Sequence, residues 1–303
     1  MHIALKVDVD TYRGTLEGVP ALLRLFDEYQ VRATFLFSLG PDHTGRALRR
    51  VFRPGFLRKV RRTSVASNYG LKTLLYGTLL PGPHIGRKAG DVMRAVAEAG
   101  HEVGIHCYDH VRWQDFVAHK DAAWTRRELE RAAEAFQQVF GRPALVHGAA
   151  GWQLNPHLLA LEQEMGFRYA SDVRGKSIFY PELQGVVSRC PQIPTTLPTL
   201  DELIGRDGVT EENVHEYVYS ASLHLLPQGH VYTLHAELEG MRLLPVMEKL
   251  LVMWKSFEGE VCALEDTFNA IDQDAIPTHH IGWCEIEGRS GHLAMQSVAL
   301  ERG

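Results

Sequence analysis

The sequence predicts an α/β fold built from alternating strands and helices in one large domain. Short β-rich segments alternate with segments of helical apolar spacing along most of the 303 residues. The composition, 45% hydrophobic and 23% charged, is that of an ordinary globular protein, and no stretch of eighteen uninterrupted apolar residues indicates a membrane-spanning helix. About seven β/α repeats favour a barrel of parallel strands over an open sheet.

The first elements follow each other at regular spacing. Residues 2–10, HIALKVDVD, have the composition of a buried strand, residues 19–30 have the apolar spacing of a helix, and residues 32–40 are β-rich and end in glycine. After a long basic segment, residues 90–100 are expected to form a helix and residues 101–107 a strand.

The same alternation continues through the second half of the chain. Residues 124–141 predict a helix that stops at a glycine, residues 143–151 a strand leading into a loop, and residues 155–166 a helix capped by Asn155. The later elements of the series are expected at 167–172, 229–237, 241–257 and 260–268. We expect residues 1–275 to form the barrel domain and residues 276–303, which lack clear periodicity, to form a C-terminal tail.

Charge is distributed unevenly along the chain. The net charge is -5, yet no acidic residue lies between Asp42 and Asp91, where eleven lysines and arginines occur. A basic segment within an acidic protein indicates an anionic partner, which the charge alone leaves open as a membrane surface, a phosphate group or nucleic acid. A solvated basic helix face is the alternative.

The cysteines indicate a reducing compartment. The four are far apart and form no Cys-x-x-Cys pair, and the N-terminus leads directly into a predicted strand rather than into a secretory segment. We therefore expect a cytoplasmic protein.

Ionisable residues stand where the predicted strands end, which is where parallel α/β folds place their chemistry. Asp8 and Asp10 share one face of the first strand because side chains alternate along a strand. His106 and His110 end another strand, and His235 ends a later one. A His-x-x-x-His spacing arises roughly once by chance in a chain with this many histidines, so the position matters more than the spacing.

Two imidazoles and one carboxylate form a set that binds a divalent ion and leaves positions open for water and substrate. We expect Asp10, His106 and His110 to hold such an ion, with Zn²⁺, Co²⁺, Mn²⁺ and Ni²⁺ as candidates. Asp8 is then free to accept a proton from water. Taken singly, each residue has an alternative role: a core histidine, a cap for Asp10, or an ion pair between Asp8 and Lys6.

Three segments, ALKVDVDT, GHEVGIHCYDH and VYTLHAE, resemble the polysaccharide deacetylases of the NodB type, carbohydrate esterase family four. The resemblance implies a distorted (β/α)₇ barrel, with Asp8 as catalytic base and His235 as the general acid that protonates the leaving amine. It also implies Asp10, His106 and His110 as metal ligands, although Val9 separates the two aspartates that are often adjacent in the family. Where the family has an arginine that orients the base, this chain has His147.

Further segments, including SDVRG and QIPTTLPTLDELIGRD, are similar to one branch of that family. This branch deformylates 4-deoxy-4-formamido-L-arabinose on undecaprenyl phosphate, which supplies the amino sugar for lipid A modification and polymyxin resistance in Gram-negative bacteria. The likeness implies a peripheral protein at the cytoplasmic face of the inner membrane. The mixture of cations and apolar residues at 46–62 suits a phospholipid-like substrate better than DNA, so we expect no nucleic-acid partner. Residues 43–90 would be a basic, apolar membrane-facing insertion. Its expected membrane-facing residues are Arg49, Arg50, Phe52, Arg53, Phe56, Arg58 and Lys59.

Three other residues are candidates for supporting roles. Asp172 could hold His235 protonated, Arg174 could bind the sugar phosphate, and His147 could supply hydrogen bonds behind the site. Two other functions compete with the deformylase. One is a deacetylase of soluble or polymeric N-acetyl sugars, and the other is a non-enzymatic module that binds anionic membranes.

Overall fold

A computed structural model describes residues 1–47, 71–256, 259–289 and 291–299. Its centre is a parallel sheet that curls into a half-barrel, with the strand order β5-β4-β3-β2-β1-β8 and with β9 beside the start of β1. The predicted α/β barrel class is therefore confirmed. The strands are β1 (His2–Val9), β2 (Thr34–Ser38), β3 (Glu102–Cys107), β4 (Val146–His147), β5 (Tyr169–Ala170), β8 (His230–His235) and β9 (Glu260–Cys262).

Strand β1 is an interior strand of the sheet and pairs with three others. It pairs in parallel with β2 on one side and with β8 on the other, so that Lys6 is the register partner of both Thr34 and Thr233. Every residue of β1 after the first is buried, because one face of the strand lines the barrel interior and the other packs under helices. A charged residue on the inner face therefore needs a partner inside the barrel.

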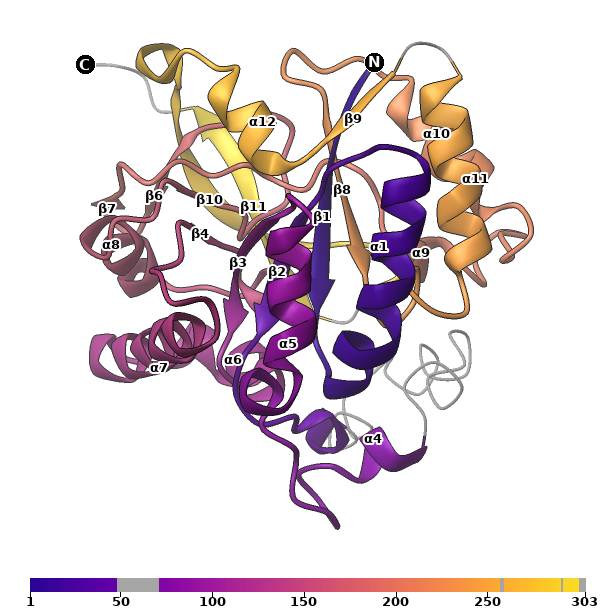
Figure 1. Cartoon of the computed structure of the whole chain (residues 1–303). Coiled ribbons are helices and arrows are strands. Elements are labelled where there is room, and N and C mark those ends of the chain that lie inside the picture. Colours follow the sequence, from indigo (N-terminus) through magenta and orange to yellow (C-terminus); the bar gives the residue numbers. More distant parts are fainter. Residues whose placement is uncertain (48–70, 257–258, 290, 300–303) are drawn as a thin grey trace.

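Helices cover the outer face of the half-barrel (Figure 1). The sequence predicted the positions of the longer helices within a few residues, except for α10, which it did not predict, and two helix ends follow the expected chemistry. The Asn155 side chain accepts a hydrogen bond from the Leu158 backbone N–H at the start of α8, and Gly141 ends α7 in the left-handed conformation, at φ 70°. The longer helices are α1 (Val19–Glu28), α5 (Ile85–Glu98), α7 (Ala122–Phe140), α8 (Pro156–Glu164), α10 (Val214–Ser222) and α11 (Leu244–Lys255).

An extended segment closes the barrel between β5 and β8. Its Ile193 N–H donates to the carbonyl of Ala170 at 2.8 Å, and its Thr196 N–H donates to the carbonyl of Val231 at 3.1 Å. This segment takes the place of a regular strand, because only isolated bridges join it to its neighbours among the described residues. The barrel is accordingly distorted on this side.

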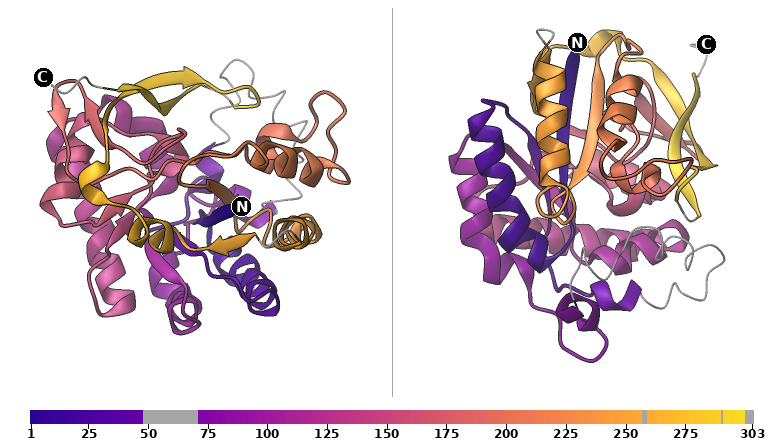
Figure 2. Two further views of the ribbon diagram at one scale, coloured as in Figure 1. Left: turned by 90° about the horizontal axis from the view of Figure 1, so that it is seen from above. Right: turned by 90° about the vertical axis from the view of Figure 1, so that its right-hand side faces the viewer.

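The C-terminal residues form a second sheet, which the sequence did not predict. β10 (Thr278–Glu285) and β11 (His292–Ala299) make a hairpin that joins β6 (Tyr180–Leu183) and β7 (Val186–Val187) in the order β11-β10-β6-β7. The hairpin lies on the side of the barrel opposite α1 and α5 (Figure 2). Residues 278–299 are thus a packed part of the fold rather than an extended tail.

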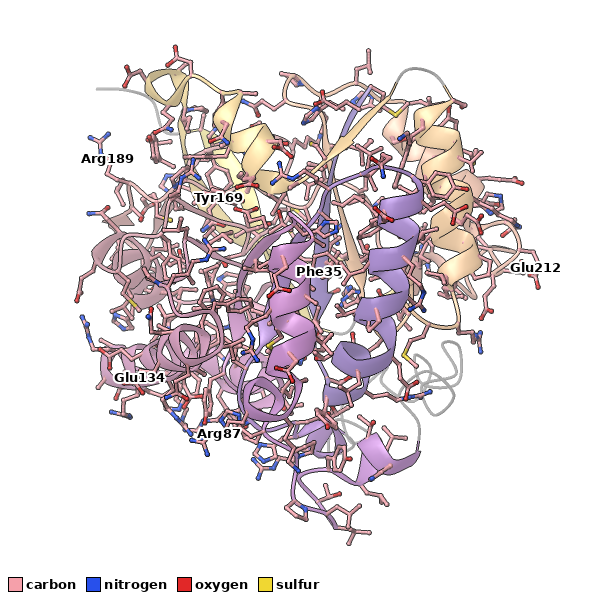
Figure 3. All side chains as sticks on the ribbon, viewed as in Figure 1. Phe35, Arg87, Glu134, Tyr169, Arg189 and Glu212 are labelled. Atoms are coloured by element: carbon pink, nitrogen blue, oxygen red, sulfur yellow. The ribbon has the colours of Figure 1, made fainter. Side chains whose placement is uncertain are left out.

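The apolar core fills the space between the sheet and its helices. Phe35 on β2 and Tyr169 on β5 are fully buried, whereas Arg87, Arg189 and Glu212 lie at the periphery (Figure 3). Within the described parts of the chain, no helix has the length and apolar composition needed to cross a membrane. Short α4 (Leu71–Leu75) lies near the end of the barrel toward which β1 runs (Figure 1).

Candidate metal centre and active site

The candidate site lies at the carboxyl ends of neighbouring parallel strands. Asp8 is the penultimate residue of β1, Asp10 follows that strand directly, and His235 ends β8. Asp8 and His235 are register partners across the two strands. Because parallel strands end at one edge of a sheet, residues more than 220 positions apart in the sequence meet here.

β3 and α6 (His110–Phe116) supply the two histidines of the predicted motif. Asp109 is the N-cap of α6, and its side chain accepts a hydrogen bond from the Arg112 backbone N–H at 3.1 Å. The other oxygen of Asp109 lies 2.6 Å from His43 Nδ1. This cap turns the chain directly after β3, so that the rings of His106 and His110 come within 5.3 Å of each other between centroids.

The Asp10 carboxylate lies between these two imidazoles. Its Oδ1 is 3.3 Å from His106 Nε2, and its Oδ2 is 3.4 Å from His110 Nε2. His106 Nδ1 lies 2.6 Å from the carbonyl oxygen of Gly148, which can only accept, so Nδ1 carries the proton in neutral imidazole. His106 Nε2 then directs a lone pair at a carboxylate oxygen, and this contact becomes favourable when a cation binds between the two acceptors.

The donor set fits a divalent metal ion. Two ligand atoms bound to one tetrahedral Zn²⁺ at about 2.0–2.1 Å lie roughly 3.3 Å apart, which agrees with both separations around Asp10. His106 and Asp10 are buried, whereas the His110 side chain is 20% exposed. The group is therefore reachable from one side, as a site that exchanges water and substrate requires.

Asp10 is held in its charged form by its neighbours. Burial raises the pKa of this carboxyl, but His110, His106 and His235, when protonated, lower it by more, and the net result is a pKa below its usual range. A buried carboxylate that stays ionised among imidazoles is a strong ligand for a cation.

Glu237 anchors the turn that carries Asp10, and sequence reasoning assigned it no role. Its Oε1 accepts hydrogen bonds from the Asp10 N–H at 3.1 Å, from the Thr11 N–H at 2.8 Å and from the Thr11 hydroxyl at 2.8 Å. Gly14 is required beside it, because a Cβ there would lie 2.0 Å from the same oxygen. The only sequence signal was its position two residues after His235.

Asp8 has two oxygens in different surroundings. Oδ2 lies 3.5 Å from the Lys6 ammonium, and Oδ1 lies 3.8 Å from His106 Nδ1. Among the described residues, Oδ1 is buried without a hydrogen-bond partner. The ion pair with Lys6 that the sequence offered as an alternative is present, and it leaves one oxygen available for a proton.

His235 completes the group from the other side of β1. Its backbone N–H donates to Glu239 Oε2 at 2.9 Å, while Glu239 Oε1 accepts from the Tyr232 hydroxyl at 3.0 Å. The ring is half-buried, and its Nδ1 has no hydrogen-bond partner in the described part of the chain. The end of β8 is thus fixed through the backbone, and the imidazole is left to interact with a ligand.

A second histidine and carboxylate group lies behind the site. His147 Nδ1 is 2.7 Å from Glu162 Oε1 and 3.1 Å from Asp172 Oδ1, and all three side chains are fully buried. Asp172 also accepts from the Ala149 N–H at 2.6 Å and from Gln192 Nε2 at 2.7 Å. The expectation that Asp172 pairs with His235 is wrong, because its oxygens are used by these neighbours.

Arg174 lies in an internal ion pair. Its guanidinium donates to Glu202 at 2.6 Å and to the Leu197 carbonyl at 2.9 Å, and it stacks 5.1 Å from the Trp152 ring centroid. The side chain is 7% exposed. These contacts engage both terminal nitrogens of a buried guanidinium, which favours a structural role over the binding of a sugar phosphate.

The predicted membrane-facing residues 49–59 lie outside the described residues. The adjoining segment is described, and it carries exposed leucines: Leu75 is 37%, Leu80 38% and Leu79 81% exposed. This segment follows β2, whose carboxyl end lies at the same end of the barrel as the site (Figure 1).

A half-barrel whose strand ends gather imidazoles and carboxylates around a cation position defines a metal-dependent hydrolase. The family model described as "Polysaccharide deacetylase" matches residues 2–170. The chain belongs to the polysaccharide deacetylase family.

Curated relatives match the chain along its length. A protein of Shewanella sediminis (strain HAW-EB3) named "Probable 4-deoxy-4-formamido-L-arabinose-phosphoundecaprenol deformylase ArnD" is 39% identical over 99% of this chain and 96% of its own. A protein of the same name from Wigglesworthia glossinidia brevipalpis is 32% identical over 95% of this chain and 100% of its own.

Solved structures share the fold. A protein from Mycobacterium smegmatis described as a polysaccharide deacetylase superimposes with a TM-score of 0.61 at 19% identity, over 91% of this chain and 92% of its own. The Bc1960 peptidoglycan N-acetylglucosamine deacetylase superimposes with a TM-score of 0.53 at 16% identity, over 89% of each chain.

Proposed function

We propose that this protein hydrolyses the formamide of undecaprenyl phosphate-linked 4-deoxy-4-formamido-L-arabinose, releasing formate and the 4-amino sugar used for lipid A modification. One observation carries the proposal. Asp10, His106 and His110 converge beside Asp8 and His235 in a chain that deformylase-named relatives match from end to end. The names of the relatives support the substrate, and the geometry supports the chemistry.

Asp10, His106 and His110 would hold one divalent ion, with Zn²⁺, Co²⁺, Mn²⁺ and Ni²⁺ as candidates. When bound, such an ion acts as a Lewis acid that polarises a carbonyl oxygen and lowers the pKa of water. The Gly148 carbonyl fixes the tautomer and the ring orientation of His106 for this task.

Proton transfer falls to the residues on either side of β1. Asp8 Oδ1 accepts a proton from the water that attacks the formyl carbon, because Oδ2 is occupied by Lys6. His235 donates a proton to the nitrogen as the carbon–nitrogen bond breaks. One water is consumed, and formate and the free amine leave the site.

Exposed leucines at the end of α4 and just after it support membrane association. Leu75, Leu79 and Leu80 are 37%, 81% and 38% exposed, and in the sequence they follow the basic residues 46–62. α4 lies near the end of the barrel toward which β1 runs (Figure 1). Apolar side chains next to cations suit the interface of an anionic bilayer. We infer a peripheral location at the cytoplasmic face of the inner membrane, where the lipid-linked sugar would be reached.

Mass spectrometry of the lipid-linked formamido sugar incubated with purified protein tests the activity. We expect formate release with a divalent ion present, loss of release with chelator, and slower turnover of the matching N-acetyl sugar. Metal-loaded protein that leaves the formamido substrate intact, or that prefers the N-acetyl sugar, would contradict the proposal.

Flotation with anionic phosphatidylglycerol vesicles tests the location. Leu79→Ser should reduce the fraction of protein that floats, since it removes an apolar side chain that is 81% exposed. Leu225→Ser is the matched control, because Leu225 is 77% exposed and precedes the amino end of β8, away from the site. Equal losses in both variants would count against a membrane-facing role for the α4 region.

A further inference from the structure

Lys6 is a fully buried charged side chain in the barrel interior. It precedes Asp8 by two residues on β1, so both side chains point to the same face, with Lys6 one layer deeper. An ammonium that is 0% exposed is strongly unfavourable unless charges and acceptors compensate it. Its partners therefore indicate why it is there.

Three groups surround the ammonium. Lys6 Nζ donates to the carbonyl of Ser171 at 3.0 Å, lies 3.5 Å from Asp8 Oδ2, and sits 5.4 Å from the centroid of the Trp152 ring. Among the residues the structure describes, Asp8 is the one carboxylate within ion-pair distance of Lys6. The positive charge is thus directed at this aspartate.

The pairing distinguishes the two oxygens of Asp8. Oδ2 faces Lys6, whereas Oδ1, buried and without a hydrogen-bond partner in the described chain, faces the side of His106. A carboxylate held at one oxygen keeps its plane fixed, so the other oxygen has a defined direction.

The stem of Lys6 is also held in place. A Cβ on Gly148 would come within 3.2 Å of Lys6 Cε and within 2.3 Å of Leu36 Cδ1, so the backbone at 148 packs closely on both side chains. The nearby imidazole of His147 cannot replace Lys6, because His147 Nδ1 faces Glu162 and Asp172. Among the described residues, the contacts of Asp8 within ion-pair distance are therefore with Lys6 and with His106 of the metal-site group.

We propose that Lys6 is a positioning residue that holds Asp8 Oδ2 and thereby directs Asp8 Oδ1 toward the water that attacks the substrate. This inference rests on the proposed function, since it assigns Lys6 a role in orienting the base of that reaction. Lys6 touches neither substrate nor metal ligand in this role.

Steady-state kinetics of Lys6→Met and Lys6→Gln test the inference. Gln keeps a donor for the Ser171 carbonyl but lacks the charge, which provides a second variant should Lys6→Met fail to fold. We expect kcat to fall about 100-fold in both, with KM within about threefold and one metal ion per chain retained, because misdirecting a reacting group slows the chemical step. Lys6→Arg should keep more activity than either.

A lysine outside the barrel interior provides the control for the Lys6 variants. Lys249→Met, on the exposed face of α11, should leave kcat unchanged. A folded, metal-loaded Lys6→Gln protein with kcat within about threefold of wild type overturns the inference. The inference also fails if Lys6→Gln lowers the rate by the same factor in the wild-type protein and in the Asp8→Asn variant, because Lys6 would then act independently of Asp8. If the wild type hydrolyses only an N-acetyl sugar, the proposed function fails, and the same variants are measured on that sugar. A crystal structure of Lys6→Gln decides without turnover: an unmoved Asp8 carboxylate contradicts the role.

Discussion

Two groups of histidine and carboxylate side chains lie within this barrel, and they behave differently. The metal-site group, Asp10, His106 and His110, opens to solvent at His110, whereas the closed group, His147, Glu162 and Asp172, has no exposed side chain. Both gather the same residue types at similar distances. The two groups differ in access and in the placement of protons rather than in residue type, which is why we expect the metal-site group and not the closed group to bind an ion.

In the closed group the charges balance without a metal. Burial lowers the pKa of His147, but Asp172 and Glu162 raise it to about 9, so the imidazole is protonated. Burial raises the pKa of Asp172, but His147 lowers it below its usual range, while burial keeps the pKa of Glu162 well above its usual range. The group then contains one cation, one anion and one neutral acid, while His147 Nε2 and Glu162 Oε2 are buried without a hydrogen-bond partner among the described residues.

The two groups are joined through one short strand end. Gly148 accepts from His106 of the metal-site group, and the next residue, Ala149, donates to Asp172 of the closed group. The closed group therefore holds the backbone next to the carbonyl that accepts from His106. We expect its role to be structural support for the open group.

The largest effect is expected from His106→Ala. Removing one of three ligands should eliminate bound metal and lower formate release by about 1000-fold or more, since the ion contributes several kcal/mol to the barrier. Metal content is measured by mass spectrometry on the purified protein, with Glu162→Gln as the control that keeps it. A His106→Ala protein with one ion per chain would move the metal away from the predicted ligands.

His235→Ala should separate catalysis from metal binding. Loss of a general acid lowers kcat by about 100-fold to 10,000-fold, and the metal content should stay at one ion per chain because His235 is not among the three ligands. The pH dependence of kcat gives a second readout. The fall in kcat at high pH that comes from deprotonation of the general acid should disappear in the variant. Unchanged kcat would show that another group protonates the amine.

Asp172→Asn should destabilise the fold while sparing the metal. The variant leaves protonated His147 buried without its anionic partner, for which we expect a loss of about 3–5 kcal/mol in the free energy of unfolding. Urea denaturation measures it. A loss below about 1 kcal/mol would show that the closed group is not charge-paired.

Glu162→Gln should change how the stability of the fold depends on pH. The folded-state pKa of Glu162 is raised above its usual 4.5, so its contribution to stability is present below that pH and is lost as pH rises. Gln keeps an acceptor for His147 and has no proton to lose. Relative to wild type, the variant should therefore gain stability as the pH rises above the usual 4.5, by up to about 1.4 kcal/mol per pH unit. A constant difference across this range would contradict a neutral Glu162.

The regular part of the fold could be predicted because local patterns specify it. β1, α7 and α8 match their predicted ranges closely, since buried alternation, apolar spacing and the Asn155 cap are local signals. The β10–β11 hairpin and the closing segment near Ile193 carry no clear period in the sequence, and the pairing of β10 with β6 and of the closing segment with β5 and β8 joins residues far apart in the chain. Those parts needed the structure.

The site likewise contains residues that the sequence could identify and contacts that it could not. Asp8, Asp10, His106, His110 and His235 could be proposed because strand ends and short motifs mark them. The contact between His147 and Glu162 could not be predicted, since a glutamate on a helix is usually expected to face solvent. The contacts of Glu237 could not be predicted either, because they depend on how the turn after β1 folds against β8.

Anomalous diffraction from crystals loaded with Co²⁺ tests the central claim most directly. The account predicts one strong peak within coordination distance of an Asp10 oxygen, His106 Nε2 and His110 Nε2, and no peak at the closed group. A peak between His147, Glu162 and Asp172, or no peak beside Asp10, would contradict it.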